Sequence, residues 1–111
     1  MRILHIDTEM TWRGGENQIR YLLEGLKATD IESDVAVRPG SAAAERLATT
    51  APIVSCQMRG GVDPRAAWHL ARHCREHDVR LIDAHTSNAH SLGLMIKALY
   101  SKPKQIGRAH V

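Results

Sequence analysis

Short apolar runs alternate with amphipathic segments along most of the chain. Four segments have the length and apolar content of buried strands: residues 2–7, 34–38, 53–57 and 81–84. Each is followed by a segment with apolar side chains at helical spacing: residues 16–28, 41–48, 64–77 and 87–100. This alternation predicts an α/β fold, a Rossmann-like parallel sheet of about four strands with helices on both faces.

Three of the predicted helices begin at residues suited to capping. Ser41 precedes the second helix, and Asp63 with Pro64 places a capping carboxylate before a proline at the first helical position of the third. Ser87 or Asn88 opens the fourth helix. These caps support the boundaries drawn from the apolar pattern.

Two loops are expected to meet at one edge of the sheet. Ligands of doubly wound folds gather at the carboxyl ends of the strands. A strand order of 3-2-1-4 places Thr8–Gly15, after the first strand, beside His85–Asn88, after the fourth. We therefore look for a site in these two loops.

Composition narrows the class of protein. With 111 residues, the chain makes at most one small domain, and the lack of Phe predicts an aliphatic core. The net charge of +3 is spread along the chain without interleaved aromatics, which argues against nucleic-acid binding. Cys56 and Cys74 match no metal or redox spacing and are expected to be buried free thiols. No apolar run is long enough to span a bilayer and no signal peptide precedes the first strand, so we expect a cytoplasmic protein.

The turn Arg13–Gly15 leads from the first strand into a helix that opens at Glu16. Gly14 and Gly15 allow close approach of a ligand, and the helix N-terminus favours an anionic group such as a phosphate. The alternative is a tight strand-to-helix turn. Glu16 either complements the helix dipole or holds a substrate hydroxyl. The pattern matches neither Gly-x-Gly-x-x-Gly nor a Walker motif.

The polar run Asp83–His90 directly follows an apolar strand. His85 is placed to project into the cleft, where an imidazole accepts a proton or binds a sugar hydroxyl; the alternative is a structural hydrogen bond. Thr86 and Asn88 offer substrate partners or cap the helix. His90, one turn further on, is a weaker candidate for substrate binding.

Two further positions are candidates for ligand contacts. Asp7 ends the first strand, where its carboxylate binds a hydroxyl or satisfies the backbone of the loop. Arg59–Gly61 follows the third strand as a second anion contact or as a flexible loop.

Three histidines of the third helix have spacing that suits a metal. His69, His73 and His77 follow one another at intervals of four residues. No carboxylate or Cys ligand is evident beside them, so we interpret them as a solvated face and expect no metal.

The last six residues differ in character from the rest. Ile106–Val111 matches one reading frame of a common sequencing adapter, so we interpret residues 106–111 as a non-native tail, the alternative being a short basic tail. Residues 1–105 are then the front piece of a longer protein. In such a fragment we expect the fourth strand to be an exposed sheet edge, unless the final helix folds over it.

Motifs in a fixed order along residues 1–104 carry a family resemblance. They are Met1–Ile6, Arg13–Gln18, Arg38–Ser41, Met58–Gly61 and Leu81–Thr86, with His90 and Gly93. Together they resemble the N-terminal domain of retaining glycosyltransferases of the two-Rossmann-domain (GT-B) class, in the glycosyltransferase family 4 group. Here Glu16 directly follows the glycines, whereas the family usually has Gly-Gly-Ala-Glu.

The resemblance implies a nucleotide-sugar-dependent transferase. It implies that Gly14 and Gly15 face the donor diphosphate and that His85 lies near the reacting sugar. The nucleotide-sugar is then a co-substrate, no metal cofactor is expected, and the acceptor is a glycan or lipid-linked molecule of the cell envelope. A missing C-terminal Rossmann domain supplies a glutamate pair, so this piece alone is expected to be inactive.

Two other classes of function remain to be weighed. A stand-alone Rossmann-like module that binds a nucleotide or phosphorylated ligand stays open. A receiver-like domain is disfavoured, because Gln57–Arg59 follows the third strand where a phosphorylatable Asp is needed. A peripheral association with the inner membrane face accompanies the glycosyltransferase interpretation.

Overall fold

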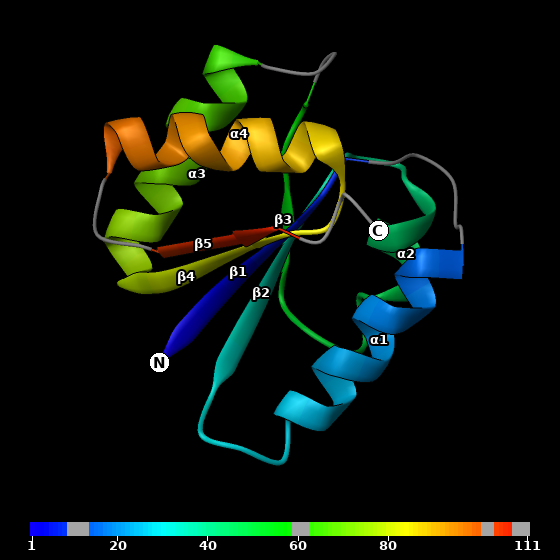
Figure 1. Ribbon diagram of the computed structural model, residues 1–111. Coiled ribbons are helices and arrows are strands. Elements are labelled where there is room, and N and C mark those ends of the chain that lie inside the picture. Colours follow the sequence, from blue (N-terminus) through cyan, green and yellow to red (C-terminus); the bar gives the residue numbers. More distant parts are fainter. Residues whose placement is uncertain (9–13, 59–62, 101–103, 108–111) are drawn as a thin grey trace.

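A parallel sheet with the strand order β3-β2-β1-β4-β5 forms the centre of the structure (Figure 1). This computed structural model describes residues 1–8, 14–58, 63–100 and 104–107. The strands are β1 (Arg2–Asp7), β2 (Glu32–Val37), β3 (Ile53–Ser55), β4 (Val79–Ala84) and β5 (Lys104–Gly107). The helices are α1 (Gly14–Leu26), α2 (Ala42–Arg46), α3 (Pro64–His77) and α4 (Ser87–Leu99).

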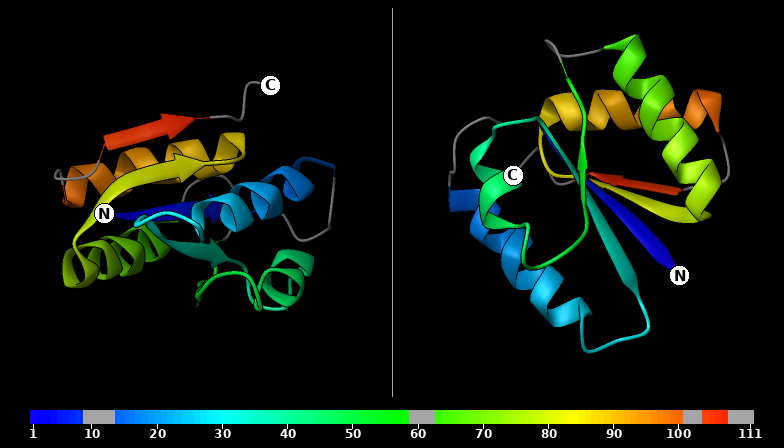
Figure 2. Two further views of the ribbon diagram at one scale, coloured as in Figure 1. Left: turned by 90° about the horizontal axis from the view of Figure 1, so that it is seen from below. Right: turned by 180° about the vertical axis from the view of Figure 1, so that it is seen from behind.

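The helices form one layer on each side of the sheet. Helices α3 and α4 pack together on one face, and α1 and α2 lie on the opposite face (Figures 1 and 2). This three-layer arrangement confirms the predicted Rossmann-like fold, with the four predicted strands in the predicted order. None of the helices within the described ranges has the length and apolar character needed to cross a bilayer.

The outer edge of β4 is covered by a fifth strand. Strand β5 pairs in parallel with β4, with Leu81 opposite Lys104 and Ala84 opposite Gly107. The expectation that the fourth strand is an exposed edge is therefore wrong. The backbone groups of β4 find partners in a segment that has too little apolar pattern to be recognised as a strand.

Local capping chemistry explains where most helices begin. The Ser41 hydroxyl accepts the Ala44 N–H at 3.1 Å, and the Asp63 carboxylate accepts the Arg65 N–H at 3.0 Å, as predicted. Helix α4 is capped by Thr86 rather than by Ser87 or Asn88. Helix α1 begins at Gly14, two residues earlier than predicted, so both glycines belong to its first turn.

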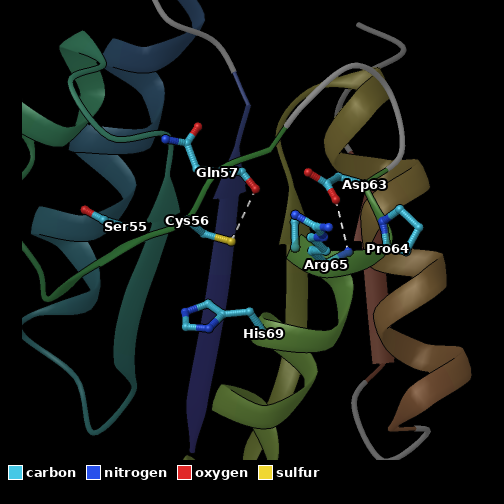
Figure 3. A pocket seen from close by; sticks show the side chains of 8 residues that line it. Ser55, Cys56, Gln57, Asp63, Pro64, Arg65 and His69 are labelled. Atoms are coloured by element: carbon cyan, nitrogen blue, oxygen red, sulfur yellow. Dashed lines mark hydrogen bonds between the residues drawn. The ribbon is translucent and has the colours of Figure 1, made fainter.

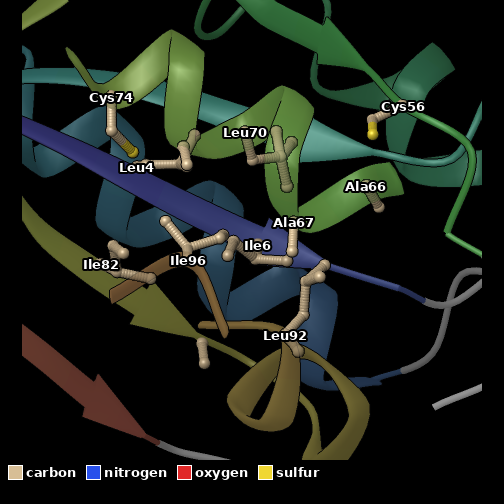
Figure 4. Close-up of a cluster of buried hydrophobic side chains, with 14 of the residues drawn as sticks. Leu4, Ile6, Cys56, Ala66, Ala67, Leu70, Cys74, Ile82, Leu92 and Ile96 are labelled. Atoms are coloured by element: carbon tan, nitrogen blue, oxygen red, sulfur yellow. The ribbon is translucent and has the colours of Figure 1, made fainter. Parts of the chain in front are cut away.

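Strand alternation divides the buried side chains between two cores. Leu4 and Ile6 of β1 point toward α3 and α4 and pack with Leu70, Leu92 and Ile96 (Figure 4). The second core lies beneath α1 and α2 and contains Ile19, Leu23, Val35, Val37, Ala43 and Leu47. Because successive residues of a strand face opposite sides, His5 and Asp7 lie on the face opposite to Leu4 and Ile6.

Both cysteines are free and buried, as predicted. Burial, together with the nearby Asp63 charge, raises the pKa of the Cys56 thiol to about 11. Burial and the Asp34 charge raise the pKa of the Cys74 thiol to about 12. Both side chains are therefore protonated at neutral pH and behave as small apolar groups.

A charged cluster joins the amino ends of β1 and β2 to helix α3. Asp34 is 2% exposed and accepts hydrogen bonds from Arg2 Nη1 at 2.6 Å and from His73 Nε2 at 2.9 Å. Burial acts to raise the pKa of Asp34, but these two partners outweigh it and the pKa is lowered. The interpretation of His73 as part of a solvated face is therefore wrong.

Candidate functional site

The carboxyl ends of β1 and β4 lie side by side, as the predicted strand order requires. Ile6 is opposite Ala84 in the sheet, and the His85 N–H continues the ladder by donating to the Ile6 carbonyl at 3.1 Å. Helix α4 begins directly after this point. From β1 the sheet continues to β2 and β3 on one side and to β4 on the other, so the strand order reverses at this point. Doubly wound folds bind their ligands at the carboxyl ends of the strands where the order reverses.

A hydrogen bond between threonines ties the two strand ends together. Thr8 Oγ1 and Thr86 Oγ1 lie 2.8 Å apart. Thr86 Oγ1 also accepts the Ala89 N–H at 3.0 Å, so Thr86 caps the helix as well. Asn88 and His90, in the first turn of α4, have exposed side chains. Thr86 therefore caps the helix, and Asn88 and His90 are exposed in its first turn.

The predicted glycine-rich contact is described in part. Gly14 and Gly15 form the start of α1, and Glu16 follows them in its first turn. The side chain of Glu16 lies outside what the structure describes, as do residues 9–13 of the preceding loop. Arg59–Gly61, the second predicted anion contact, also lies outside the described residues.

Asp7 and His85 are turned inward. Asp7 is 1% exposed, and the His85 side chain is 7% exposed. A buried carboxylate holds the imidazole of His85 against the sheet, which is the contact that the structural alternative for this residue requires. His85 Nε2 lies 3.2 Å from Asp83 Oδ2, within hydrogen-bonding range.

His5 completes a buried cluster with Asp83 and His85. His5 Nδ1 lies 3.2 Å from Asp83 Oδ2 and 3.2 Å from His85 Nε2. The two imidazole rings are tilted by 32°, with 5.4 Å between their centroids. On its other side, His5 Nε2 lies 3.3 Å from Ser33 Oγ. One carboxylate oxygen and two ring nitrogens therefore converge on one point between β1 and β4.

The carboxylate of this cluster is ionised at neutral pH. Burial acts to raise the pKa of Asp83, but hydrogen bonds from His5 and His85 outweigh it, and the pKa is held well below its usual range. Such a carboxylate fixes the orientation of both rings. A carboxylate with two imidazoles also forms a donor set that binds transition metals.

The sequence patterns mark Asp83 only as the start of a polar run and do not mark His5 as a site residue. Each is a polar residue inside an otherwise apolar strand, which is the signal that marks them. They become neighbours because His5 is opposite Asp83 in the pairing of β1 with β4. That register is a property of the folded sheet.

A second hollow lies at the carboxyl end of β3. Its volume is about 710 Å³, and the side chains around it come from the end of β3 and the start of α3 (Figure 3). The lining residues are Ser55, Cys56, Gln57, Asp63, Pro64, Arg65, Ala66 and His69. Cys56 Sγ donates to the Gln57 carbonyl at 3.6 Å. None of the predicted site residues is among the described residues that line it, and the lining combines polar side chains with a larger apolar surface.

One solved structure has a similar fold. The chain is similar to the crystal structure of Acinetobacter baumannii MurG, with a TM-score of 0.76 and 12% sequence identity. The match covers 96% of this chain and 34% of that one, so this chain spans about a third of the length of MurG. No curated protein matches the sequence. At this identity the likeness shows the fold.

The family follows from the sequence itself. The family model for Glycosyltransferase Family 4 matches residues 12–110, nearly the whole chain. The match includes the glycines that begin α1, all of β2 to β4, and the polar run that opens α4. It confirms the resemblance seen in the sequence motifs. The chain therefore belongs to glycosyltransferase family 4.

Proposed function

We propose that this chain is the acceptor-side domain of a retaining GT-B glycosyltransferase that takes its sugar from a nucleotide-sugar. The observation that carries the proposal is the family match over residues 12–110. The fold adds support, because the carboxyl strand ends, where doubly wound sheets bind ligands, carry Asp7 and Thr8 at the end of β1 and His85 and Thr86 after β4. Transfer uses the nucleotide-sugar as co-substrate, and no metal takes part in that step.

The start of α1 is the part of the domain that we assign to the donor diphosphate. Gly14 and Gly15 give the helix terminus no side chain that blocks a phosphate, and the helix dipole favours its charge. Arg38, half-buried at the end of β2, adds a positive charge near this edge, and its Nε has no hydrogen-bond partner among the described residues.

The start of α4 is the part that we assign to the reacting sugar. Thr86, Asn88 and His90 offer hydroxyl, amide and imidazole groups in one helical turn. His85 lies beneath them with Nε2 turned toward Asp83, so a contact with the sugar uses Nδ1. Asp7, buried at the carboxyl end of β1, belongs to the same part of the site.

The acceptor is assigned to the hollow between β3 and α3. It opens at the same edge of the sheet as the strand ends described above, and its volume of about 710 Å³ suits a sugar or other small polar group. A glycan or lipid-linked acceptor of the cell envelope is the proposed class. The net charge of +3 favours an anionic acceptor or membrane face.

An exposed aromatic and basic surface supports a peripheral position at a membrane. Trp68 is 59% exposed and Leu99 47%, and both line a shallow groove with Arg72 and Arg75. Aromatic and basic side chains combined on one surface bind the headgroup region of anionic bilayers. We propose that the protein works at the cytoplasmic face of the inner membrane in this way.

The source DNA downstream of codon 105 provides the sharpest test. A second Rossmann domain with a Glu-x7-Glu stretch in frame supports the transferase proposal. A native stop codon instead supports the alternative, a stand-alone module that binds a nucleotide or phosphorylated ligand.

An assay of the purified chain tests the same choice. We expect no sugar transfer from nucleotide-sugar donors, because half of the cleft belongs to the other domain. Robust transfer by the chain alone contradicts the proposal. Micromolar binding of a free nucleotide without any acceptor favours the stand-alone module.

A further inference from the structure

We propose that His5, Asp83 and His85 bind one transition-metal ion, with zinc as the best fit. Their ligand atoms are His5 Nδ1, Asp83 Oδ2 and His85 Nε2. Two imidazole nitrogens and one carboxylate oxygen form a donor set that zinc commonly uses. The site goes beyond sugar transfer and is independent of it, since it needs only side chains of this chain.

The spacing of the three atoms matches a metal better than a hydrogen bond. All three separations are 3.2 Å. Ligand atoms about 2.1 Å from zinc at tetrahedral angles lie about 3.3–3.4 Å apart. Hydrogen bonds between a charged and a neutral or charged partner are shorter, roughly 2.7–2.9 Å. In addition, His5 Nδ1 is equidistant from Asp83 Oδ2 and His85 Nε2, and one ring nitrogen, with a single N–H or a single lone pair, cannot form a well-aligned hydrogen bond to both.

The burial of the cluster also favours an ion. His5 and Asp83 are each 1% exposed. A divalent cation between the three ligand atoms compensates a buried carboxylate charge more completely than a neutral imidazole does.

The surroundings supply what a metal site requires beyond its ligands. His5 Nε2 lies 3.3 Å from Ser33 Oγ, the kind of outer hydrogen bond that orients a ligating ring. The His85 side chain retains 7% exposure, which gives an ion access from the carboxyl edge of the sheet. An ion here joins β1 to β4 and leaves one position of a tetrahedron for water or a ligand.

The sequence does not reveal this site because its ligands are far apart in the chain. His5 and His85 are 80 residues apart and meet only through strand pairing. The histidines that do have metal-like spacing serve another purpose, since His73 Nε2 is hydrogen-bonded to Asp34 and the His73 ring contacts that of His77. They provide the matched control.

Calorimetric titration of the metal-free chain with Zn²⁺ tests the proposal. We expect one ion per chain and a rise in Tm on the order of 10 °C at saturation. His5→Gln and His85→Gln are expected to abolish saturable binding, and Ser33→Ala to weaken it by about 10-fold. His77→Gln, the control, is expected to bind as the unaltered chain does.

Two outcomes overturn the proposal. One is the lack of saturable binding up to about 1 mM Zn²⁺. This result would mean that hydrogen bonds alone join the three side chains. The other is binding that survives His5→Gln and His85→Gln but is lost in His77→Gln.

A measurement on the unaltered chain guards against variants that fail to fold. Zn²⁺ is expected to shift the ring nitrogen resonances of His5 and His85 in NMR spectra and to leave those of His69 and His77 in place. Co²⁺ is expected to bind without the thiolate absorption that ligation by Cys56 or Cys74 produces. Shifts confined to the helix α3 histidines, or a thiolate band, contradict the site.

Discussion

The two ends of the sheet each bury an aspartate against histidine, yet they differ in what else surrounds the charge. At the amino end, Asp34 contacts the guanidinium of Arg2 as well as His73. At the carboxyl end, Asp83 contacts two imidazoles, those of His5 and His85. A guanidinium stays charged at any physiological pH, whereas an imidazole can lose its proton or exchange it for a metal. The cluster around Asp34 therefore stabilises the fold permanently, whereas the cluster around Asp83 can exchange a proton for a metal ion.

Replacing each aspartate by asparagine gives the largest effect and tests this difference directly. Asp34→Asn is expected to lower the free energy of unfolding by about 3 kcal/mol, because it leaves the charge of Arg2 without its buried partner. Asp83→Asn is expected to cost only about 1–2 kcal/mol in metal-free protein, since the asparagine amide can still hydrogen-bond to a ring nitrogen and no guanidinium loses its partner. Urea denaturation measures both. Equal losses in the free energy of unfolding would contradict the proposed difference between the two clusters.

The exposed partner of Arg2 provides the control for this pair of variants. Glu32 also contacts Arg2, but its side chain is 64% exposed. Glu32→Gln is therefore expected to change the free energy of unfolding by less than about 0.5 kcal/mol. A loss as large as that of Asp34→Asn would locate the stabilising charge at the surface.

Acid is expected to weaken both clusters in the same direction. The pKa of Asp34 and that of Asp83 are lowered in the folded chain, relative to about 3.9 in an unfolded one. Their stabilisation is fully present above the unfolded pKa and is lost as the pH falls below it toward the folded values. Denaturation measured from pH 7 to pH 2 should therefore show a decline that begins near pH 5. The decline should be shallower in Asp34→Asn, and an unchanged slope would contradict the pairing.

The cap of α4 tests whether the site edge depends on one hydroxyl. Thr86→Ala removes both the bond to the Ala89 N–H and the link to Thr8, and is expected to cost about 1–2 kcal/mol. Thr86→Ser retains the hydroxyl and should restore most of this. Thermal denaturation of the three proteins makes the comparison, and a serine variant as unstable as alanine would point to the methyl group instead.

The smallest effect concerns the two thiols. Cys56 is 7% exposed beside the hollow at the carboxyl end of β3, and Cys74 is fully buried near Asp34. Both have a raised pKa, of about 11 and about 12, so alkylation of the folded chain at neutral pH is expected to be slow. Mass spectrometry should show Cys56 modified first. Faster modification of Cys74 would mean that the amino end opens before the carboxyl end.

The layered fold could be predicted because its information is local. Residues 2–7 and 81–84 are apolar over a strand length, and Ser41 and Asp63 mark helix starts by their own hydrogen bonds. Strand β5 is not predicted because its four residues carry no such pattern, and its last two, Ile106 and Gly107, fall in the segment interpreted as a non-native tail. That interpretation of residues 106–111 stays a prediction.

The residues of the site could be predicted only where they are neighbours in the sequence. His85, Thr86 and Asn88 adjoin a strand end and were identified for that reason. The inward turn of His85 depends on Asp83 and on His5, which joins them through the register of β1 with β4. The partnership of His73 with Asp34 likewise depends on how α3 docks on the sheet. Such contacts between distant segments cannot be inferred from periodicity.

The central position of β1 also determines the order in which the chain can fold. β1 is made first, but its neighbours β2 and β4 begin at residues 32 and 79. During synthesis, one edge of β1 therefore stays unpaired until β4, residues 79–84, has left the ribosome. Contacts between such distant residues are slow to form, and an unpaired strand is prone to association while it waits. Among the described strands, β1 therefore keeps one edge unpaired over the longest stretch of synthesis.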